Sequence, residues 1–361
     1  MWFSGGRVFH RFELSVVHLL TLVSIVEPRN LQRAFNNSIS AAYIFGDSTV
    51  DPGNNNFVTT PFRSNFPPYG RDFAGGIPTG RFTDGAYIGI KEYVPPYLEP
   101  TLNLEELKSG VSFASAGSGL DPLTPQLLSV ISMEKQLEYF KEYKLRMEAA
   151  IGKEGTKSLI SKAAFLISVG TNDIVINYYG TPFRRKTYDI TSYLHFLLQN
   201  IEQFIQALMK EGAQLITVVG MPPLGCLPIV ITATSGGEAV GRRPCLDPLS
   251  SIALDYNQKL QNIMALNMRN SGAILIYADI YKPLNDLIHN ASHFGFEVVN
   301  AGCCGSGLVE VTFLCNEKSI VCEKPSKYVF FDSVHPTEAA YSYIFQTFRP
   351  LIDSTIKKYG L

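Results

Sequence analysis

Five short apolar runs recur along the chain, and they end beside glycine or polar residues, as buried strands do. They lack the alternation of apolar and polar positions that a half-exposed antiparallel sheet shows. The runs are Ala41–Phe45, Val111–Ala114, Ala164–Val169, Leu215–Val219 and Ala273–Ala278. The pattern therefore predicts a sheet of about five buried strands.

Segments with the helical hydrophobic period lie between and after these runs. The clearest covers Tyr188–Glu211, with Gly212 as its expected C-terminal cap. Two further helices are expected at Ile252–Arg269 and from Thr337 toward Lys358. The alternation of strands and helices predicts an α/β fold whose parallel sheet is covered on both faces. In such folds, ligands bind at the carboxyl ends of the strands.

Two segments rich in Gly, Pro and Asn each follow the end of a predicted strand, and both are long for connecting loops. They cover Asp51–Gly80 and Met221–Arg243. Long loops at this edge either form the walls of a binding cleft or are surface connections without a function.

The first 30 residues have the order of charges and apolar residues that is typical of a secretory signal peptide. Arg7 and Arg11 precede the apolar stretch Leu14–Val26. No A-x-A cleavage site follows, so an uncleaved anchor is the alternative. The apolar stretch is shorter than the ~20 residues that a membrane span needs. We therefore predict a secreted protein with a single domain over residues 40–355 and no stable membrane span in the mature chain.

The balance of charge argues against a nucleic-acid partner, because 31 Lys+Arg residues stand against 32 Asp+Glu. Six cysteines lie in the C-terminal half, and in an exported chain an even number favours disulfides over buried thiols. Their spacing does not match a metal site, and six cysteines allow 15 pairings. Glycosylation sequons at Asn36 and Asn290 fit an exported protein.

Polar residues suited to acyl chemistry follow several of the apolar runs. Ser48 follows the first run within Gly-Asp-Ser, and Asn172 follows the third. Near the C-terminus, Asp332 and His335 are spaced so that the carboxylate can bind imidazole Nδ1 and leave Nε2 for a serine. Gly117 lies in a turn of small residues that could present backbone N–H groups. Each residue alone fits a cap or a turn, but together they indicate an active site at one sheet edge.

The segment Tyr43–Asn56 resembles the first block of plant GDSL esterases/lipases, a family of the SGNH hydrolase superfamily. Four later segments resemble the later family blocks in the same order: Gly80–Gly85, Gly170–Asp173, Pro222–Cys226 and Asp332–Glu338. The resemblance covers roughly Ala41 to Pro350, and five ordered blocks make coincidence improbable. It implies a three-layer αβα sandwich with a central parallel sheet, the flavodoxin-like fold of SGNH hydrolases.

The resemblance also implies a role for each candidate residue. Ser48 would be the nucleophile, His335 the general base and Asp332 its orienting carboxylate. The backbone N–H groups of Ser48 and Gly117 and the side-chain amide of Asn172 would form the oxyanion hole. No metal or organic cofactor is required, and the expected partner is a small-molecule or lipid ester. The oligomeric state is not readable from the sequence.

Three positions depart from the family pattern, but none of them is a catalytic group. Thr49 replaces the leucine of the family name, Ser112 replaces a usual asparagine, and Phe331 replaces a frequent tryptophan. Two alternatives to an ester hydrolase remain open. An acyltransferase would use the same triad with an alcohol in place of water, and a non-catalytic member would bind a lipid or glycan in the same cleft.

Overall fold

A sheet of four parallel strands lies at the centre of the fold. In this computed structural model the strands follow the order β1 (Ala42–Gly46), β2 (Ala164–Ser168), β3 (Leu215–Val219) and β4 (Ile274–Ala278). The pairing is regular, so Gly46, Ser168, Val219 and Ala278 end the four strands side by side. The segments that leave these strands therefore begin at one edge of the sheet.

The structure describes residues 39–83, 94–234 and 243–359, which belong to the compact unit Ile39–Leu361. The predicted signal peptide at residues 1–30 and the sequon at Asn36 lie outside the described residues. None of the helices within the described ranges has the length and hydropathy needed to cross a membrane.

The expectation of about five strands needs correction, because Val111–Ala114 is not a regular strand. This segment runs beside β1 through a single parallel bridge between Ile44 and Ser112. On its outer side the Ser112 N–H donates to the Pro95 carbonyl at 2.9 Å, and the Tyr97 N–H donates to the Ser112 carbonyl at 2.8 Å. The Asn54 side-chain amide also donates to the carbonyls of Ser112 and Ala114 at 2.8 Å each. With the segment counted as the second strand, the order is 2-1-3-4-5, which is the flavodoxin-like order.

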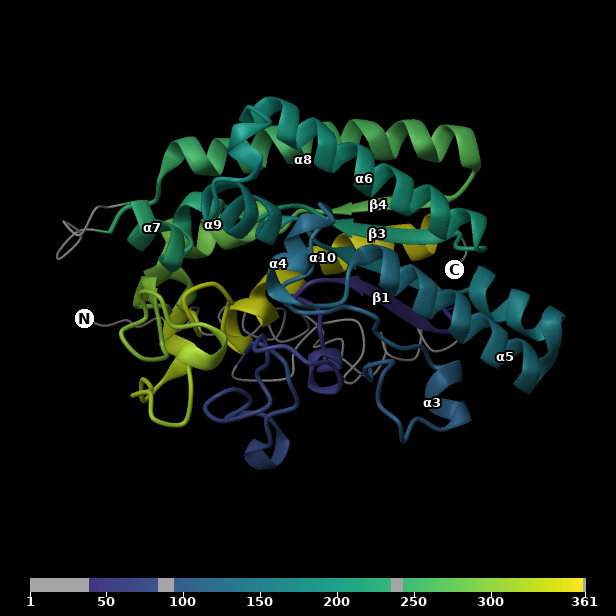
Figure 1. The fold of residues 1–361 in the computed structure, drawn as a ribbon, viewed down its shortest axis with the longest axis horizontal. Helices are drawn as coiled ribbons and strands as arrows, with labels where there is room; N and C mark the ends of the chain where they lie inside the picture. The colour runs from purple at the N-terminus through teal and green to yellow at the C-terminus, as the bar shows by residue number, and fades with distance from the viewer. Residues whose placement is uncertain (1–38, 84–93, 235–242, 360–361) are drawn as a thin grey trace, which may run out of the picture. The chain divides into compact units, whose positions relative to one another are not determined.

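Helices cover the sheet on both sides. Figure 1 shows α6 and α8 above β3 and β4, and α10 below them. The helices are α3 (Leu104–Lys108), α4 (Leu123–Leu128), α5 (Met133–Ser161), α6 (Ile190–Lys210), α7 (Pro228–Thr234), α8 (Asp247–Ser271), α9 (Tyr281–His289) and α10 (Glu338–Tyr359). The three helices expected from the hydrophobic period correspond to α6, α8 and α10, and this confirms the α/β fold class.

The caps of α6 explain why its predicted bounds lie close to the observed ones. The Asp189 side chain accepts the Ser192 N–H at 2.7 Å and so satisfies a free donor of the first turn. At the other end Gly212 has φ +110°, a conformation that side chains disfavour.

Aromatic residues fill the core between the first strands and helices α5 and α6. Phe45 on β1 lies 5.8 Å from the ring of Phe140 on α5 and 5.5 Å from that of Phe204 on α6. Gly46 follows with φ +136°, and a Cβ there would lie 1.9 Å from the Ser168 carbonyl oxygen. Only glycine therefore allows the close turn that leads from the packed strand to Asp47 and Ser48.

The C-terminal part contains a second parallel sheet, which the hydrophobic pattern did not predict. It pairs β5 (Val298–Gly302) with β6 (Tyr328–Phe330). Disulfides join Cys226 to Cys245, Cys303 to Cys322 and Cys304 to Cys315. The expected use of all six cysteines in disulfides is thus confirmed. Two of the three bonds close the segment between β5 and β6.

Candidate active site

Ser48 lies in the turn that leaves β1, and two interactions fix the backbone of this turn. The Asp47 N–H donates to the Ser168 carbonyl at 3.0 Å. The Gln136 side chain on α5 binds both backbone groups of Gly46, accepting from its N–H at 2.8 Å and donating to its carbonyl at 2.9 Å. Ser48 is half-buried at the end of this fixed turn, so its hydroxyl has a defined position.

The predicted Ser–His–Asp arrangement is present in the structure. Ser48 Oγ lies 2.7 Å from His335 Nε2, and His335 Nδ1 lies 2.7 Å from Asp332 Oδ2. The serine and the histidine are 287 residues apart in the chain. The arrangement is that of a hydroxyl whose proton can pass to an imidazole, with a carboxylate that fixes the orientation of the ring.

Asp332 and His335 come from the second sheet, not from the central one. They follow β6, and their loop is held by Asp332 Oδ1, which accepts the N–H groups of Val334 at 2.8 Å and His335 at 2.7 Å. Asp332 is 0% exposed and His335 is 3% exposed. All candidates were expected at the ends of strands, but the separate small sheet that these two residues follow was not predicted.

Asn172 and Gly117 lie on neighbouring segments. Asn172 follows β2, and its Nδ2 donates to the Ser118 carbonyl at 2.9 Å. A side-chain amide carries two N–H donors, so one remains for another acceptor. Among the described residues, the backbone N–H groups of Ser48 and Gly117 have no hydrogen-bond acceptor. Three donors are therefore free to bind a ligand atom.

Buried carboxylates hold the loop that carries Gly117. Asp51 accepts the Ala116 N–H at 2.9 Å on the side of β1. On the side of β2, Asp173 accepts the N–H groups of Leu120 at 2.8 Å and Asp121 at 3.0 Å. The loop is thus tied to the segments that carry Ser48 and Asn172. The first part of the predicted cleft wall at Asp51–Gly80 has this supporting role.

Burial raises the pKa of Asp47 to about 6, although hydrogen bonds from Thr49 and the charge of His335 lower it. Thr49, which replaces the family leucine, also bonds Ser168: its Oγ1 lies 2.9 Å from Asp47 Oδ1 and 2.7 Å from Ser168 Oγ. The departure at Thr49 therefore adds polar contacts behind the nucleophile.

Two residues that support the site were missed from the sequence. Tyr69 donates to Asp332 Oδ2 at 2.8 Å, and Gln136 binds Gly46 as described above. Tyr69 is an aromatic residue inside a loop rich in Pro and Gly. Aromatic residues are often buried, so the residue type indicates that Tyr69 packs inside the protein. Gln136 gives no such signal, because a polar residue on a charged helix is usually exposed.

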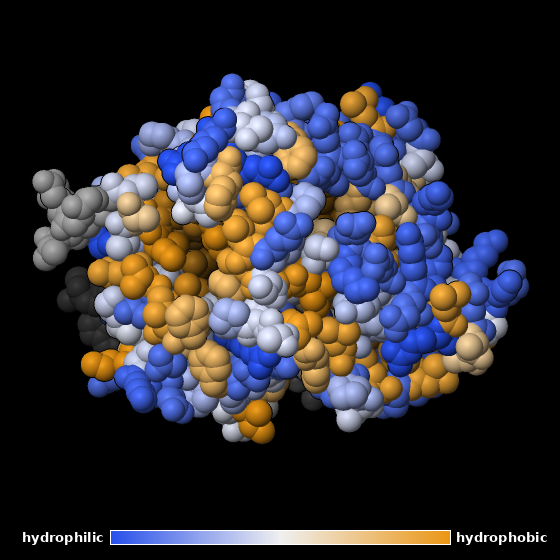
Figure 2. Space-filling model, in the orientation of Figure 1, coloured by the Kyte–Doolittle hydropathy of each residue, from blue (hydrophilic) through white to orange (hydrophobic). Residues whose placement is uncertain are grey.

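Two small hollows flank the Ser48–His335 pair. One has a cavity volume of about 30 Å³ and is lined in part by Leu227, Ile280 and Leu284. The other, of about 20 Å³, lies beside Ser48 and Phe82. Figure 2 shows hydrophobic residues around a depression over α7 and α9.

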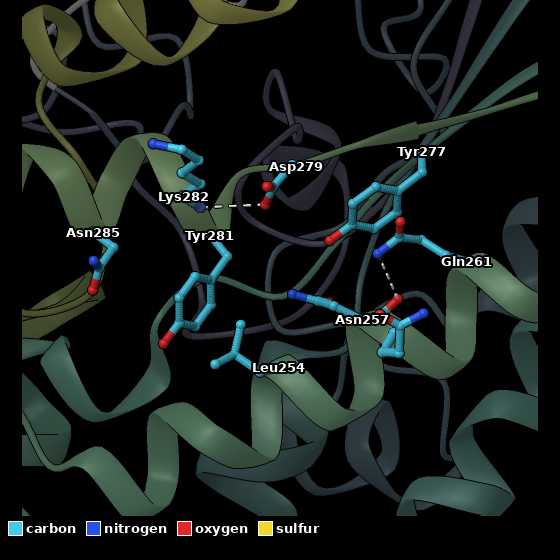
Figure 3. Close-up of a pocket in the computed structure, with 9 residues that line it drawn as sticks. Leu254, Asn257, Gln261, Tyr277, Asp279, Tyr281, Lys282 and Asn285 are labelled. Atoms are coloured by element: carbon cyan, nitrogen blue, oxygen red, sulfur yellow. Dashed lines mark hydrogen bonds between the residues drawn. The ribbon is translucent and has the colours of Figure 1, made fainter.

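A larger pocket of about 280 Å³ lies between α8 and α9 near the end of β4. Figure 3 shows Tyr277 and Tyr281 on its walls, with Asn257 and Gln261 from α8. Asn257 is engaged by the Met221 backbone, accepting its N–H at 2.7 Å and donating to its carbonyl at 2.9 Å. The lining holds no serine or histidine. The pocket is therefore separate from the candidate catalytic residues.

The chain is similar to plant esterases over most of its length. It is 52% identical to "GDSL esterase/lipase At5g45960" of Arabidopsis thaliana over 344 residues, which cover 92% of each chain. It is 41% identical to "GDSL esterase/lipase At1g06990" of the same plant, over 83% of this chain and 86% of the relative.

Solved structures of lipases also match. An extracellular lipase from Streptomyces rimosus has a TM-score of 0.34 and 14% identity, over 87% of this chain and 99% of the other. Phospholipase A1 from Streptomyces albidoflavus has a TM-score of 0.36 and 12% identity, over 88% of this chain and 99% of the other.

The family model for GDSL-like Lipase/Acylhydrolase matches residues 43–348, a range that contains every candidate residue of the site. With this match and relatives that are more than 40% identical over most of both chains, the resemblance seen in the sequence is confirmed. The protein belongs to the GDSL esterase/lipase family of carboxylic ester hydrolases.

Proposed function

We propose that the protein cleaves carboxylic esters through an acyl-enzyme on Ser48. The observation that carries the proposal is the pair of 2.7 Å contacts from Ser48 Oγ to His335 Nε2 and from His335 Nδ1 to Asp332 Oδ2. In the first step His335 takes the Ser48 proton while Oγ attacks the ester carbonyl, and the protonated imidazole then protonates the leaving alcohol. In the second step His335 activates water, which releases the acid.

The negative charge of the tetrahedral intermediate needs donors that are in place before the reaction. The N–H groups of Ser48 and Gly117 and the second amide hydrogen of Asn172 are the donors that we assign to this oxyanion hole. Each such donor typically contributes about 3 to 4 kcal/mol to the stability of the transition state. Because the loop with Gly117 is tied to both neighbouring strand ends, these donors need little rearrangement during the reaction.

The substrate that we propose to test first is an ester with a short acyl chain. The hollow beside His335 has Leu227, Ile280 and Leu284 on its wall, and these side chains suit a hydrocarbon group. The chemistry is that of a small-molecule or lipid ester. We also propose that the protein is secreted, since its three disulfides are typical of oxidising compartments.

The decisive experiment measures hydrolysis of a short-chain aryl ester and labelling by a fluorophosphonate probe. We expect wild-type protein to show both, and Ser48→Ala to lose labelling and at least ~10³-fold of kcat/KM. Ser333→Ala is a matched control, because the Ser333 hydroxyl is buried beside Asp332 without a partner among the described residues. This control should keep both activities.

Absence of hydrolysis and labelling in the wild type would reject the proposal. Labelling of Ser48→Ala would assign the nucleophile to another serine. If turnover occurs only after an alcohol acceptor is added, the protein transfers the acyl group and does not hydrolyse the ester.

A further inference from the structure

We propose that Tyr69 is a positioning residue of the active site: its hydroxyl fixes the Asp332 carboxylate and weakens the hold of this carboxylate on the His335 proton. The inference rests on the proposed function, because it concerns the base of the same reaction. It adds a fourth member to the hydrogen-bonded set Ser48, His335 and Asp332.

The hydrogen bonds of Asp332 are complete only with Tyr69. Oδ2 accepts the Tyr69 hydroxyl at 2.8 Å and faces His335 Nδ1 at 2.7 Å. Oδ1 accepts the N–H groups of Val334 and His335. A carboxylate has about four sites for donors, so all of them are used. Because Asp332 is fully buried, these four donors take the place of water around its charge.

The direction of the Tyr69 proton is fixed by a second contact. The backbone N–H of Thr312 donates to the Tyr69 hydroxyl oxygen at 2.9 Å. A backbone N–H can only donate, so the phenol must accept from Thr312 and send its one proton to Asp332. Burial and the nearby charge of Asp332 raise the pKa of Tyr69, which keeps the phenol protonated. The hydrogen bonds from Thr312 to Tyr69 and from Tyr69 to Asp332 therefore point in the same direction.

The ring of Tyr69 has no freedom to leave this position. It is 1% exposed and packs against Phe66, Phe82 and Phe331, with ring centroids 6.0, 5.5 and 5.6 Å away. Phe82 in turn lies 5.0 Å from the His335 ring. Tyr69→Phe would keep these ring contacts and remove only the hydroxyl.

Loss of the hydroxyl should make His335 more basic. Tyr69 takes part of the negative charge on Oδ2, and without this bond the carboxylate would bind the imidazolium more strongly. Asp47, Ser48 and Tyr341 lie near His335, and Arg81 lines the hollow beside Ser48 and Phe82. Tyr69→Phe leaves all four groups in place. Protonated His335 cannot act as the base, so the acidic limb of kcat/KM should move to higher pH.

The test compares the wild type, Tyr69→Phe and Tyr143→Phe. Tyr143 is also fully buried, and its hydroxyl donates to the Leu107 carbonyl at 2.9 Å, away from the triad. We expect Tyr69→Phe to shift the acidic limb upward by roughly half a unit to one unit, while Tyr143→Phe loses stability without a shift. Replacement of Tyr69 by 3-fluorotyrosine, a stronger donor, should shift the limb the other way.

A titration of the imidazole by NMR, in protein labelled with ¹⁵N-histidine, provides a readout that needs no substrate. The His335 signals are assigned by their loss in His335→Gln. The midpoint for His335 should rise in Tyr69→Phe by the same amount as the kinetic limb. A midpoint unchanged in Tyr69→Phe would overturn the inference, even if the variant is less active. An inactive wild type would reject the proposed function, yet the titration would still decide the role of Tyr69.

Discussion

At the scale of single residues, Asp173 joins the two segments that present the assigned oxyanion donors. It follows Asn172 directly, and it accepts hydrogen bonds from the Leu120 and Asp121 N–H groups and from the Thr124 hydroxyl at 2.5 Å. Burial raises the pKa of Asp173 to about 7, and the nearby charge of Asp121 adds to this, while its hydrogen bonds lower it. Asp121 is itself paired with Arg184 at 2.6 Å.

The raised pKa of Asp173 predicts that stability falls as pH rises. Between its ordinary value of 3.8 and about 7, the folded state keeps a proton that the unfolded state has lost. The free energy of unfolding therefore decreases across this window, by at most ~1.4 kcal/mol per pH unit for one proton, and levels off above it. When the free energy of unfolding is measured with denaturant at several pH values, it should decrease less steeply with pH for Asp173→Asn than for wild type. Equal slopes would contradict the prediction.

The residues of the site differ in how far the sequence predicts them. Ser48, Asp332 and His335 were predictable, because a serine after a strand and an Asp-x-x-His loop are local patterns with a chemical meaning. Tyr69 and Gln136 were not predictable, because they act through contacts with residues far away in the chain. Gln136 lies 90 positions from Gly46.

At the scale of elements, α5 shows where the hydrophobic pattern fails. This helix of 29 residues was not predicted, because its buried face includes the polar residues Gln136 and Thr156, and Gly152 interrupts its helical backbone. β1, β2 and α6 were predicted well. The two strands are short continuous apolar runs followed closely by Gly, whereas α6 follows the helical period and has Asp189 and Gly212 at its ends. The sheet of β5 and β6 was missed because neither strand can be identified without its partner.

α5 should contribute to catalysis through Gln136. In Gln136→Leu the N–H and the carbonyl of Gly46 would lose their partners in a buried position. We expect a loss of about 2 to 4 kcal/mol in the free energy of unfolding, together with a lower kcat, because Gly46 lies two residues before Ser48. Thermal or denaturant unfolding and ester hydrolysis measure the two effects.

Gln126→Leu on α4 is the control, since Gln126 is exposed and its side chain makes no hydrogen bond within the described part of the chain. It should resemble wild type. A Gln136→Leu protein with normal kcat would show that the turn before Ser48 holds its shape without α5.

At the scale of the whole molecule, the disulfides divide into two kinds. Cys226–Cys245 closes the segment that follows β3, whereas Cys303–Cys322 and Cys304–Cys315 close the segment that contains Thr312. The sequence predicted that the cysteines pair, but not which ones, because pairing depends on how the chain returns from β5 to β6.

The two kinds of disulfide should differ in their effect on activity. Removal of Cys226–Cys245 by a double alanine variant should lower the free energy of unfolding by roughly 3 kcal/mol. Removal of Cys304–Cys315 should also lower kcat, because the loop around Thr312 supports Tyr69 and Asp332. Calorimetry and ester hydrolysis on both variants check this. Equal kcat values in the two variants would contradict the link between the loop and the active site.

The positions of these disulfides determine when a newly made chain can become an active enzyme. Disulfides do not persist in a reducing cytosol, so a newly made chain would lack both bonds that hold the Thr312 loop. We expect such a precursor to be poorly active even where its central sheet is complete. On the secretory route that we propose, oxidation would then be the maturation step, and esters in the cytosol of the producing cell would be spared.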